Sequence, residues 1–147
     1  MIGALFETGS AMGIRMHVLG IGTDIIEVAR IGQMIEKHDE LFLRRVYTSA
    51  EIDYCAGRKA AMQHYAGRWA AKEAALKALG TGWAKGIQWT DLEVANLPGG
   101  KPELKIHGAA LQIAGELGIN QMQISLSHCR AFAVAYVIAL GEAATQP

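Results

Sequence analysis

The spacing of apolar residues changes near the start of the chain. Val18, Leu19 and Ile21 are typical of a short strand. From Asp24 onward the spacing becomes helical, with apolar residues at Ile25, Val28, Ile31 and Ile35. The pattern therefore predicts a strand followed directly by a helix, with Asp24 at the junction between them.

Two further helices are predicted in the middle of the chain. The sequence "TSAE" (48–51) has the capping-box pattern of a helix start, and Gly57 is placed to end that short helix. A longer helix is predicted from about Ala60 to Leu79, because this stretch is rich in Ala, Leu, Lys and Glu. Gly80 stands where such a helix commonly ends.

The second half of the chain has the pattern of two strand pairs. Residues 86–108 alternate on both sides of "LPGG", as two strands joined by a turn do. Residues 109–117 predict a short helix closed by Gly118, and residues 122–140 predict two antiparallel strands connected tightly around His128. Helices followed by strand pairs predict an α+β fold with an antiparallel sheet.

Composition narrows the class of protein. A chain of 147 residues suits one domain, and 51% apolar with 19% charged residues favours some apolar surface buried between subunits. The formal charge of zero gives no reason to expect nucleic acid or an anionic membrane as a partner. The longest apolar run, 131–140, is shorter than the roughly 20 residues of a membrane helix. Two cysteines, Cys55 and Cys129, are interpreted as reduced thiols of a cytoplasmic protein.

The first residues stand apart from the periodic part of the chain. Residues 1–15 lack the basic and apolar regions of a signal peptide, and Met16 comes directly before the first predicted strand. We expect residues 1–15 to form a disordered N-terminal extension or to precede an alternative start. Residues 16–141 are predicted to form the domain, and residues 142–147 a C-terminal tail.

Several polar residues have simple structural interpretations when each is taken alone. Asp24 could cap a helix, with Glu27 three residues later completing the cap. Glu73 and Lys77 could form an intrahelical ion pair worth about 0.3 kcal/mol. His128 could be an ordinary turn residue.

Taken together, the same residues indicate a site for a metal ion and phosphate. Asp24 and Glu73 are isolated carboxylates, and Mg²⁺ typically takes one or two carboxylates together with water and substrate phosphate oxygens. Gly82, in "GTG" after the long helix, allows close approach of the backbone to an anion. Positive charge for phosphate groups is available from Lys77, Arg68, Lys72, Lys101 and His128.

Four motifs resemble one family in their order along the chain. They are "GIGTDIIEVARI", "RWAAKEAALKALGTG", "GKPEL" and "SLSHCRAFAVAYVI". Their order is that of the holo-[acyl-carrier-protein] synthases, the small stand-alone branch of the 4′-phosphopantetheinyl transferases, and the resemblance spans residues 16 to about 140. It implies a single domain with an antiparallel sheet packed on a long central helix, completed by trimerisation with sites between neighbouring subunits.

The resemblance also implies an activity and its residues. The family transfers the 4′-phosphopantetheine group of coenzyme A to a serine of apo-acyl carrier protein, in support of fatty acid biosynthesis, and uses Mg²⁺. The motifs place the metal ligands at Asp24 and Glu73, and the catalytic residues at Glu73, Lys77 and His128. The residues expected to contact coenzyme A are Arg68, Lys72, Gly82, Lys101, Pro102, Ser127 and His128.

The carrier protein of this family is acidic and is expected to dock on the helix after "GTDI". Arg30, Arg44 and Arg45 are the expected anchors. Residues 24–45 nevertheless contain five acidic and four basic residues, so the attraction should be weak. The alternative is docking through apolar contacts around Ile31, Met34 and Phe42.

Two other functions use overlapping chemistry. A Mg²⁺-dependent hydrolase of the coenzyme A diphosphate would need the same ligands but no carrier protein. A non-catalytic coenzyme A-binding module would keep the basic residues and could dispense with the acidic pair. The presence of both Asp24 and Glu73 weighs against the module.

Overall fold

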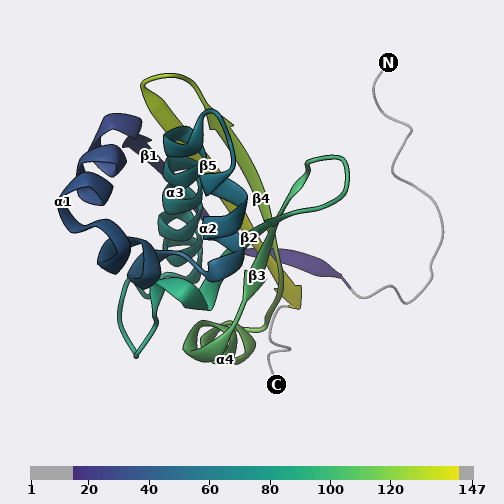
Figure 1. The fold of residues 1–147 in the computed structure, drawn as a ribbon. Helices are drawn as coiled ribbons and strands as arrows, with labels where there is room; N and C mark the ends of the chain where they lie inside the picture. The colour runs from purple at the N-terminus through teal and green to yellow at the C-terminus, as the bar shows by residue number, and fades with distance from the viewer. Residues whose placement is uncertain (1–14, 143–147) are drawn as a thin grey trace, which may run out of the picture.

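The computed structural model describes residues 15–142 and confirms the predicted α+β fold (Figure 1). The predictions for residues 1–14 and 143–147 concern parts of the chain outside the described residues, so the division into extension, domain and tail stays a prediction. The elements follow in the order β1 (Met16–Glu27), α1 (Val28–Val46), α2 (Ser49–Ala56), α3 (Ala61–Leu79), the 3₁₀ turn η1 (Trp89–Asp91), β2 (Leu92–Asn96), β3 (Pro102–Ile106), α4 (Gly108–Glu116), β4 (Ile119–His128) and β5 (Phe132–Glu142).

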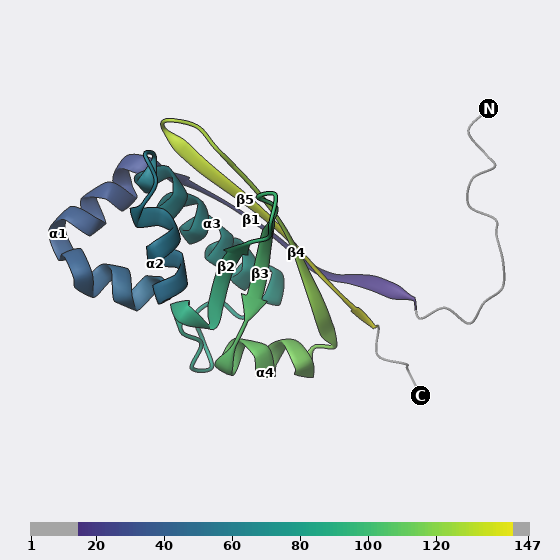
Figure 2. The ribbon, with the colours of Figure 1, turned by 45° about the vertical axis from the view of Figure 1, so that its right-hand side comes forward.

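Three long strands form an antiparallel sheet in the order β1–β5–β4, and β2 and β3 form a separate hairpin. β1 pairs with β5 along its whole length, from Met16 opposite Glu142 to Glu27 opposite Phe132. In Figures 1 and 2 the helices lie on one side of the long strands, and α3 lies against β1 and β5. The predicted antiparallel sheet packed on a long central helix is confirmed.

Two glycines of β1 allow α3 to approach the sheet closely. A Cβ atom added to Gly22 would lie 1.9 Å from the carbonyl oxygen of Ala74, and one added to Gly20 would lie 2.0 Å from that of Ala78. On the helix side Ala74 and Ala78 are at most 5% exposed, and further alanines of α3 are fully buried, namely Ala66, Ala70, Ala71 and Ala75. Because α3 is enclosed on most sides, it has no single apolar face of the kind that a surface helix shows.

The predicted ends of the central helices are confirmed. The Thr48 hydroxyl accepts a hydrogen bond from the Glu51 amide at 3.3 Å, and the Glu51 carboxylate accepts one from the Thr48 amide at 3.0 Å. Gly57 caps the end of α2, and Gly80 ends α3 in the left-handed conformation with φ 77°. Within residues 15–142 no helix combines the length and the apolar character needed to cross a bilayer.

The predicted junction at Asp24 is wrong. Asp24 lies inside β1, opposite Ala135 of β5, and the helix begins only at Val28. The N-cap residue of α1 is Glu27, whose side chain makes no capping hydrogen bond, so the capping interpretation of Asp24 is wrong as well. The reason is that pairing with β5 extends the strand through a stretch in which alternating and helical spacing overlap.

The face of the sheet turned away from α3 is apolar and exposed. Gly20 and Gly22 point toward α3, so the alternating residues of β1 point to the opposite face. Ile21 and Ile25 there are 64% and 62% exposed. Val18 of β1 is also exposed, and β5 adds three exposed apolar side chains, namely Phe132, Tyr136 and Ile138. Such a surface is typical of an interface with another protein chain.

We expect Gly22→Ala to lower the free energy of unfolding by about 3 kcal/mol or more, because the new methyl group would overlap a helix carbonyl. Gly115→Ala in α4 is a matched control, since its added Cβ would meet no atom within 4 Å. Urea unfolding of both variants measures the difference. Equal midpoints would contradict the close contact between β1 and α3.

Candidate active site

The structure brings Asp24, Glu73 and Lys77 together where β1 crosses α3. The Lys77 ammonium donates to the carbonyl oxygen of Thr23 at 2.8 Å and to Asp24 Oδ1 at 3.3 Å. Both partners of the Lys77 ammonium therefore belong to β1. A simple intrahelical pair of Glu73 and Lys77 does not account for these two contacts. The Asp24 carboxylate is 17% exposed, whereas the Lys77 side chain is 54% exposed.

The electrostatic surroundings of Glu73 fit a cation site. Burial raises the pKa of Glu73, a hydrogen bond from Trp83 lowers it, and the nearby charge of Asp24 raises it again. Lys77 offsets part of this repulsion. A divalent cation shared by the two carboxylates would remove the remainder, so the donor set fits Mg²⁺.

Two carboxylates are too few to hold a metal ion by themselves. Among residues 15–142 no group of three or more His, Cys, Asp or Glu side chains is arranged for metal binding. Mg²⁺ commonly keeps several water molecules and takes phosphate oxygens from a bound substrate. The site therefore suits a cation that arrives with, or is completed by, a phosphate ligand.

His128 is the last residue of β4 and contacts the first turn of α3, where it belongs to a second cluster of polar side chains. Its Nδ1 atom lies 2.8 Å from Oε1 of Gln63. The ring of His64 stands edge-on to it, with centroids 5.3 Å apart, and Tyr54 stands edge-on to His64 at 5.6 Å. Burial lowers the pKa of His64, as does the positive charge that His128 can carry.

Arg68 joins this second cluster to the turn between β2 and β3. The guanidinium carbons of Arg58 and Arg68 lie 3.8 and 4.1 Å from the ring centroid of Tyr54. Arg68 is 3% exposed and donates to Oδ1 of Asn96 at 2.7 Å, while Asn96 donates to the carbonyl oxygen of Gly100 at 3.0 Å. The Nε atom of Arg68 is buried and has no hydrogen-bond partner among residues 15–142.

The two clusters occupy different parts of α3. Gln63 and Glu73 are ten residues apart, about 15 Å along the helix axis. Arg68 and Glu73 point in directions about 140° apart around that axis. A single chain therefore brings Asp24, Glu73 and Lys77 together but places His128 with Arg68, away from them.

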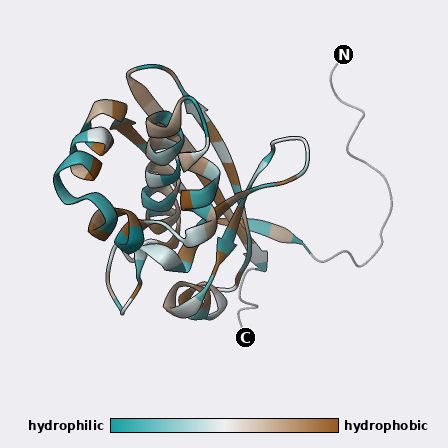
Figure 3. Ribbon diagram, viewed as in Figure 1, coloured by the Kyte–Doolittle hydropathy of each residue, from teal (hydrophilic) through white to brown (hydrophobic). Residues whose placement is uncertain are grey.

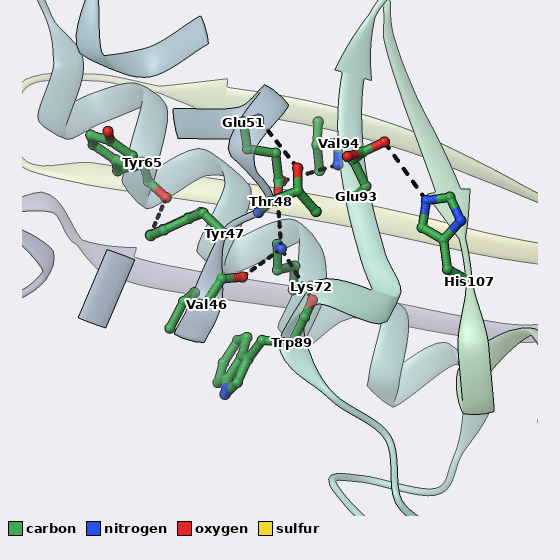
Figure 4. A network of polar contacts seen from close by, with 10 residues as sticks. All are labelled: Val46, Tyr47, Thr48, Glu51, Tyr65, Lys72, Trp89, Glu93, Val94 and His107. Atoms are coloured by element: carbon green, nitrogen blue, oxygen red, sulfur yellow. Dashed lines mark hydrogen bonds and ion pairs between the residues drawn. The ribbon is translucent and has the colours of Figure 1, made fainter. Parts of the chain in front are cut away.

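Lys72 belongs to neither cluster, which does not fit its predicted contact with coenzyme A. Its side chain has no exposed surface, and its ammonium donates to the carbonyl oxygens of Val46 at 2.7 Å and Trp89 at 3.1 Å (Figure 4). The third bond goes to Glu51 Oε1 at 2.7 Å. An ammonium has three donors, and all three bind inside the protein. The other Glu51 oxygen accepts from the Val94 amide at 3.1 Å.

The remaining predicted contact residues lie on turns and strand ends. Gly82 has φ 58° just after α3, Lys101 is exposed in the β2–β3 turn, and Pro102 begins β3. Ser127 is exposed on β4 beside His128. Their contacts with coenzyme A stay predictions.

Sequence reasoning missed Tyr54, Gln63 and Asn96. Asn96 precedes "LPGG", and asparagine commonly bonds turn backbone, so its bond to Gly100 had a sequence signal. Its contact with Arg68 had none, and neither did the contacts of Tyr54 and Gln63, because they depend on how distant segments pack.

The docking surface expected on α1 stays a prediction, and its three arginines are exposed. In Figure 3 the ribbon of α1 alternates between hydrophilic and hydrophobic residues. Arg30 is exposed, and Arg44 pairs with Glu40 on the surface. Ile31 and Phe42 are 1% and 6% exposed, so these two side chains offer little surface for apolar contacts, and the alternative stays a prediction.

An apolar hollow of about 600 Å³ lies beside α1. α1 is interrupted at Asp39, which has φ 45° and ψ −126°. Leu41, two residues later, is 82% exposed. The residues that line the hollow are Met34, His38, Leu41, Phe42, Arg45, Val46, Trp69 and Trp89.

We expect Lys72→Met to lower the free energy of unfolding by about 3–5 kcal/mol, because it leaves the Glu51 carboxylate buried without its counter-ion. The double variant Glu51→Leu/Lys72→Met should lose less than the sum of the single changes. Glu40→Gln is the control, since the exposed pair of Glu40 and Arg44 is worth less than about 1 kcal/mol. If Lys72→Met left the urea unfolding midpoint unchanged and raised the KM for coenzyme A, the result would instead support the predicted contact between Lys72 and coenzyme A.

Comparison with known proteins places this geometry in a family. The 4′-phosphopantetheinyl transferase superfamily matches residues 20–137. The holo-[acyl-carrier-protein] synthase of Koribacter versatilis is 49% identical over 121 residues, which cover 82% of this chain and 97% of the relative. That of Rhodopirellula baltica is 46% identical, with 84% and 98% covered.

Solved structures agree with the sequence relatives. The holo-[acyl-carrier-protein] synthase of Neisseria meningitidis superposes with a TM-score of 0.77 at 31% identity, covering 84% of this chain and 98% of that one. The enzyme of Bacillus anthracis, in complex with coenzyme A (3′,5′-ADP), gives a TM-score of 0.71 at 37% identity, with 87% and 100% covered. The chain belongs to the 4′-phosphopantetheinyl transferase superfamily.

Proposed function

We propose that the chain transfers the 4′-phosphopantetheine group of coenzyme A to a serine of apo-acyl carrier protein, releasing adenosine 3′,5′-bisphosphate. The observation that carries this proposal is the meeting of Asp24, Glu73 and Lys77 on β1 and α3. Relatives that share almost their entire length with the chain carry the name of this activity. We further propose that the reaction takes place in the cytoplasm and supports fatty acid biosynthesis.

Asp24 and Glu73 would hold Mg²⁺, which when bound withdraws negative charge from the diphosphate of coenzyme A. The Lys77 ammonium lies beside this site, and its exposure leaves it free to contact a phosphate oxygen. There it stabilises the negative charge that develops on the departing nucleotide phosphate.

The transfer itself makes one bond and breaks one bond. The serine oxygen of the carrier protein forms a bond with the pantetheine-side phosphorus, and the bond between that phosphorus and the bridging oxygen breaks. The electron pair leaves with adenosine 3′,5′-bisphosphate. We propose that Glu73 accepts the serine proton, directly or through an ordered water molecule. A carboxylate of the carrier protein is the other candidate for the base.

We propose that a complete site forms between neighbouring subunits of a homotrimer. Asp24, Glu73 and Lys77 would come from one subunit, and Arg68 and His128 from its neighbour. Two observations support this arrangement. Within one chain Gln63, the α3 contact of His128, lies about 15 Å along the helix axis from Glu73, and Arg68 points about 140° away from Glu73. The outer face of the sheet is apolar and exposed.

We expect Asp24→Asn and Glu73→Gln to reduce transfer by 100-fold or more, because each removes a ligand of the cation. Glu116→Gln, on exposed α4, is the matched control. Mass spectrometry of a carrier protein incubated with coenzyme A and Mg²⁺ measures the transfer, and circular dichroism checks folding. Full activity of either variant with excess chelator would contradict the metal site. Cleavage of coenzyme A without carrier protein would instead favour the hydrolase.

The docking proposal has a separate test. We expect Arg30→Glu to raise the KM for apo-carrier protein several-fold while leaving that for coenzyme A nearly unchanged, since Arg30 is exposed on α1. Salt should weaken the association only mildly, because acidic residues of α1 oppose the attraction. Steady-state kinetics at two ionic strengths measures both effects. An unchanged carrier KM would move docking away from this part of α1.

A further inference from the structure

The orientation of the Gln63 side-chain amide places its oxygen, an acceptor, against Nδ1 of His128, and this assigns a hydrogen to Nδ1. Oε1 of Gln63 lies 2.8 Å from Nδ1 of His128. An amide oxygen only accepts hydrogen bonds, so Nδ1 must be the donor. A neutral imidazole has one N–H, and Nε2 therefore keeps its lone pair. In an imidazolium both nitrogens donate, and Nδ1 still donates to Gln63.

The position of Gln63 is well defined by the helix. The backbone amide of Gln63 donates to the carbonyl oxygen of Ala60 at 3.0 Å, and the backbone amide of His64 donates to the same oxygen at 3.3 Å. The His64 ring stands at 69° to the His128 ring, with Tyr54 behind it. The first turn of α3 therefore presents both an acceptor and a ring surface to His128.

The β4–β5 turn does not need Gln63 to stay in place. The Cys129 amide donates to the carbonyl oxygen of Phe132 at 2.9 Å, which closes the turn. The Val28 amide donates to the carbonyl oxygen of Ala131 at 2.8 Å, which fixes the turn to the start of α1. A role for Gln63 as a simple support of the turn is therefore not required by the backbone contacts.

We propose that Gln63 is a positioning residue: its Oε1 accepts the Nδ1–H of His128 and so keeps Nε2 free, and in the protonated ring Nε2–H donates to a phosphate oxygen of coenzyme A. The second half of this inference rests on the proposed contact between His128 and coenzyme A. With Nδ1 engaged in both protonation states, a proton gained at Nε2 turns that nitrogen from an acceptor into a donor without turning the ring.

Nitrogen-15 NMR of the histidine rings in the full-length protein tests the tautomer directly. In the unaltered chain we expect His128 to show the pattern of a protonated Nδ1. Gln63→Met removes the acceptor at similar length, so His128 should shift toward the other tautomer. Gln63→Glu keeps an acceptor and should restore the Nδ1–H pattern. Gln112→Met, on the exposed face of α4, is the matched control and should leave His128 unchanged.

Kinetics separates positioning from support of the fold. We expect Gln63→Met to raise the KM for coenzyme A about three- to tenfold, because the charged ring then lacks the acceptor that binds Nδ1–H and orients Nε2. The urea unfolding midpoint of Gln63→Met should stay close to that of Gln112→Met. A protonated Nε2 in the neutral ring of the unaltered chain, or an unchanged tautomer in Gln63→Met, would overturn the inference about Gln63. If His128→Ala leaves the KM for coenzyme A unchanged, the phosphate contact fails, and the NMR result still decides which tautomer Gln63 selects.

Discussion

At the centre of the molecule, the ammonium of Lys72 and the carboxylate of Glu51 lie 2.7 Å apart, and neither side chain has any exposed surface. Removing two charges from water costs several kcal/mol each, and the cost is offset only where the remaining donors and acceptors are bonded. Here they are, and each bond reaches a different element around α3 (Figure 4). The partners are the end of α1, the start of α2, η1 and β2, through Val46, Thr48, Trp89 and Val94. The pair therefore fixes how these elements surround the central helix.

A central helix held in this way can be enclosed on most sides and still present functional groups. Its alanines and the glycines of β1 bring the backbones close together, so Glu73 meets Asp24 and Lys77 reaches Thr23. On another sector, Arg68 is directed to the β2–β3 turn. Polar and apolar side chains therefore alternate around α3, because the helix packs through its alanines and also directs its polar side chains to neighbouring strands and turns.

The fold could be predicted from local patterns, and the site only in part. The capping box at Thr48, the end of α3 at Gly80 and the "LPGG" turn all follow from short-range chemistry. The strand through Asp24 was not predicted, because its extension depends on β5, more than 100 residues later. Lys72 has the same helix-forming and charged character as Lys77, and only the position of Glu51 distinguishes a buried lysine from an exposed one.

The location of Asp24 within a strand has a consequence for the chemistry. A carboxylate on a helix cap moves with a helix end that can fray, whereas Asp24 is held by ladder pairing with Ala135 on a strand pressed against α3. Glu73 projects from that same helix, so both carboxylates belong to one rigid contact between β1 and α3. Catalysis of phosphoryl transfer depends mainly on positioning and on preorganised charge. The close approach of Gly20 and Gly22 to α3 thus brings two like charges near each other, and in the proposed reaction Mg²⁺ would offset their repulsion.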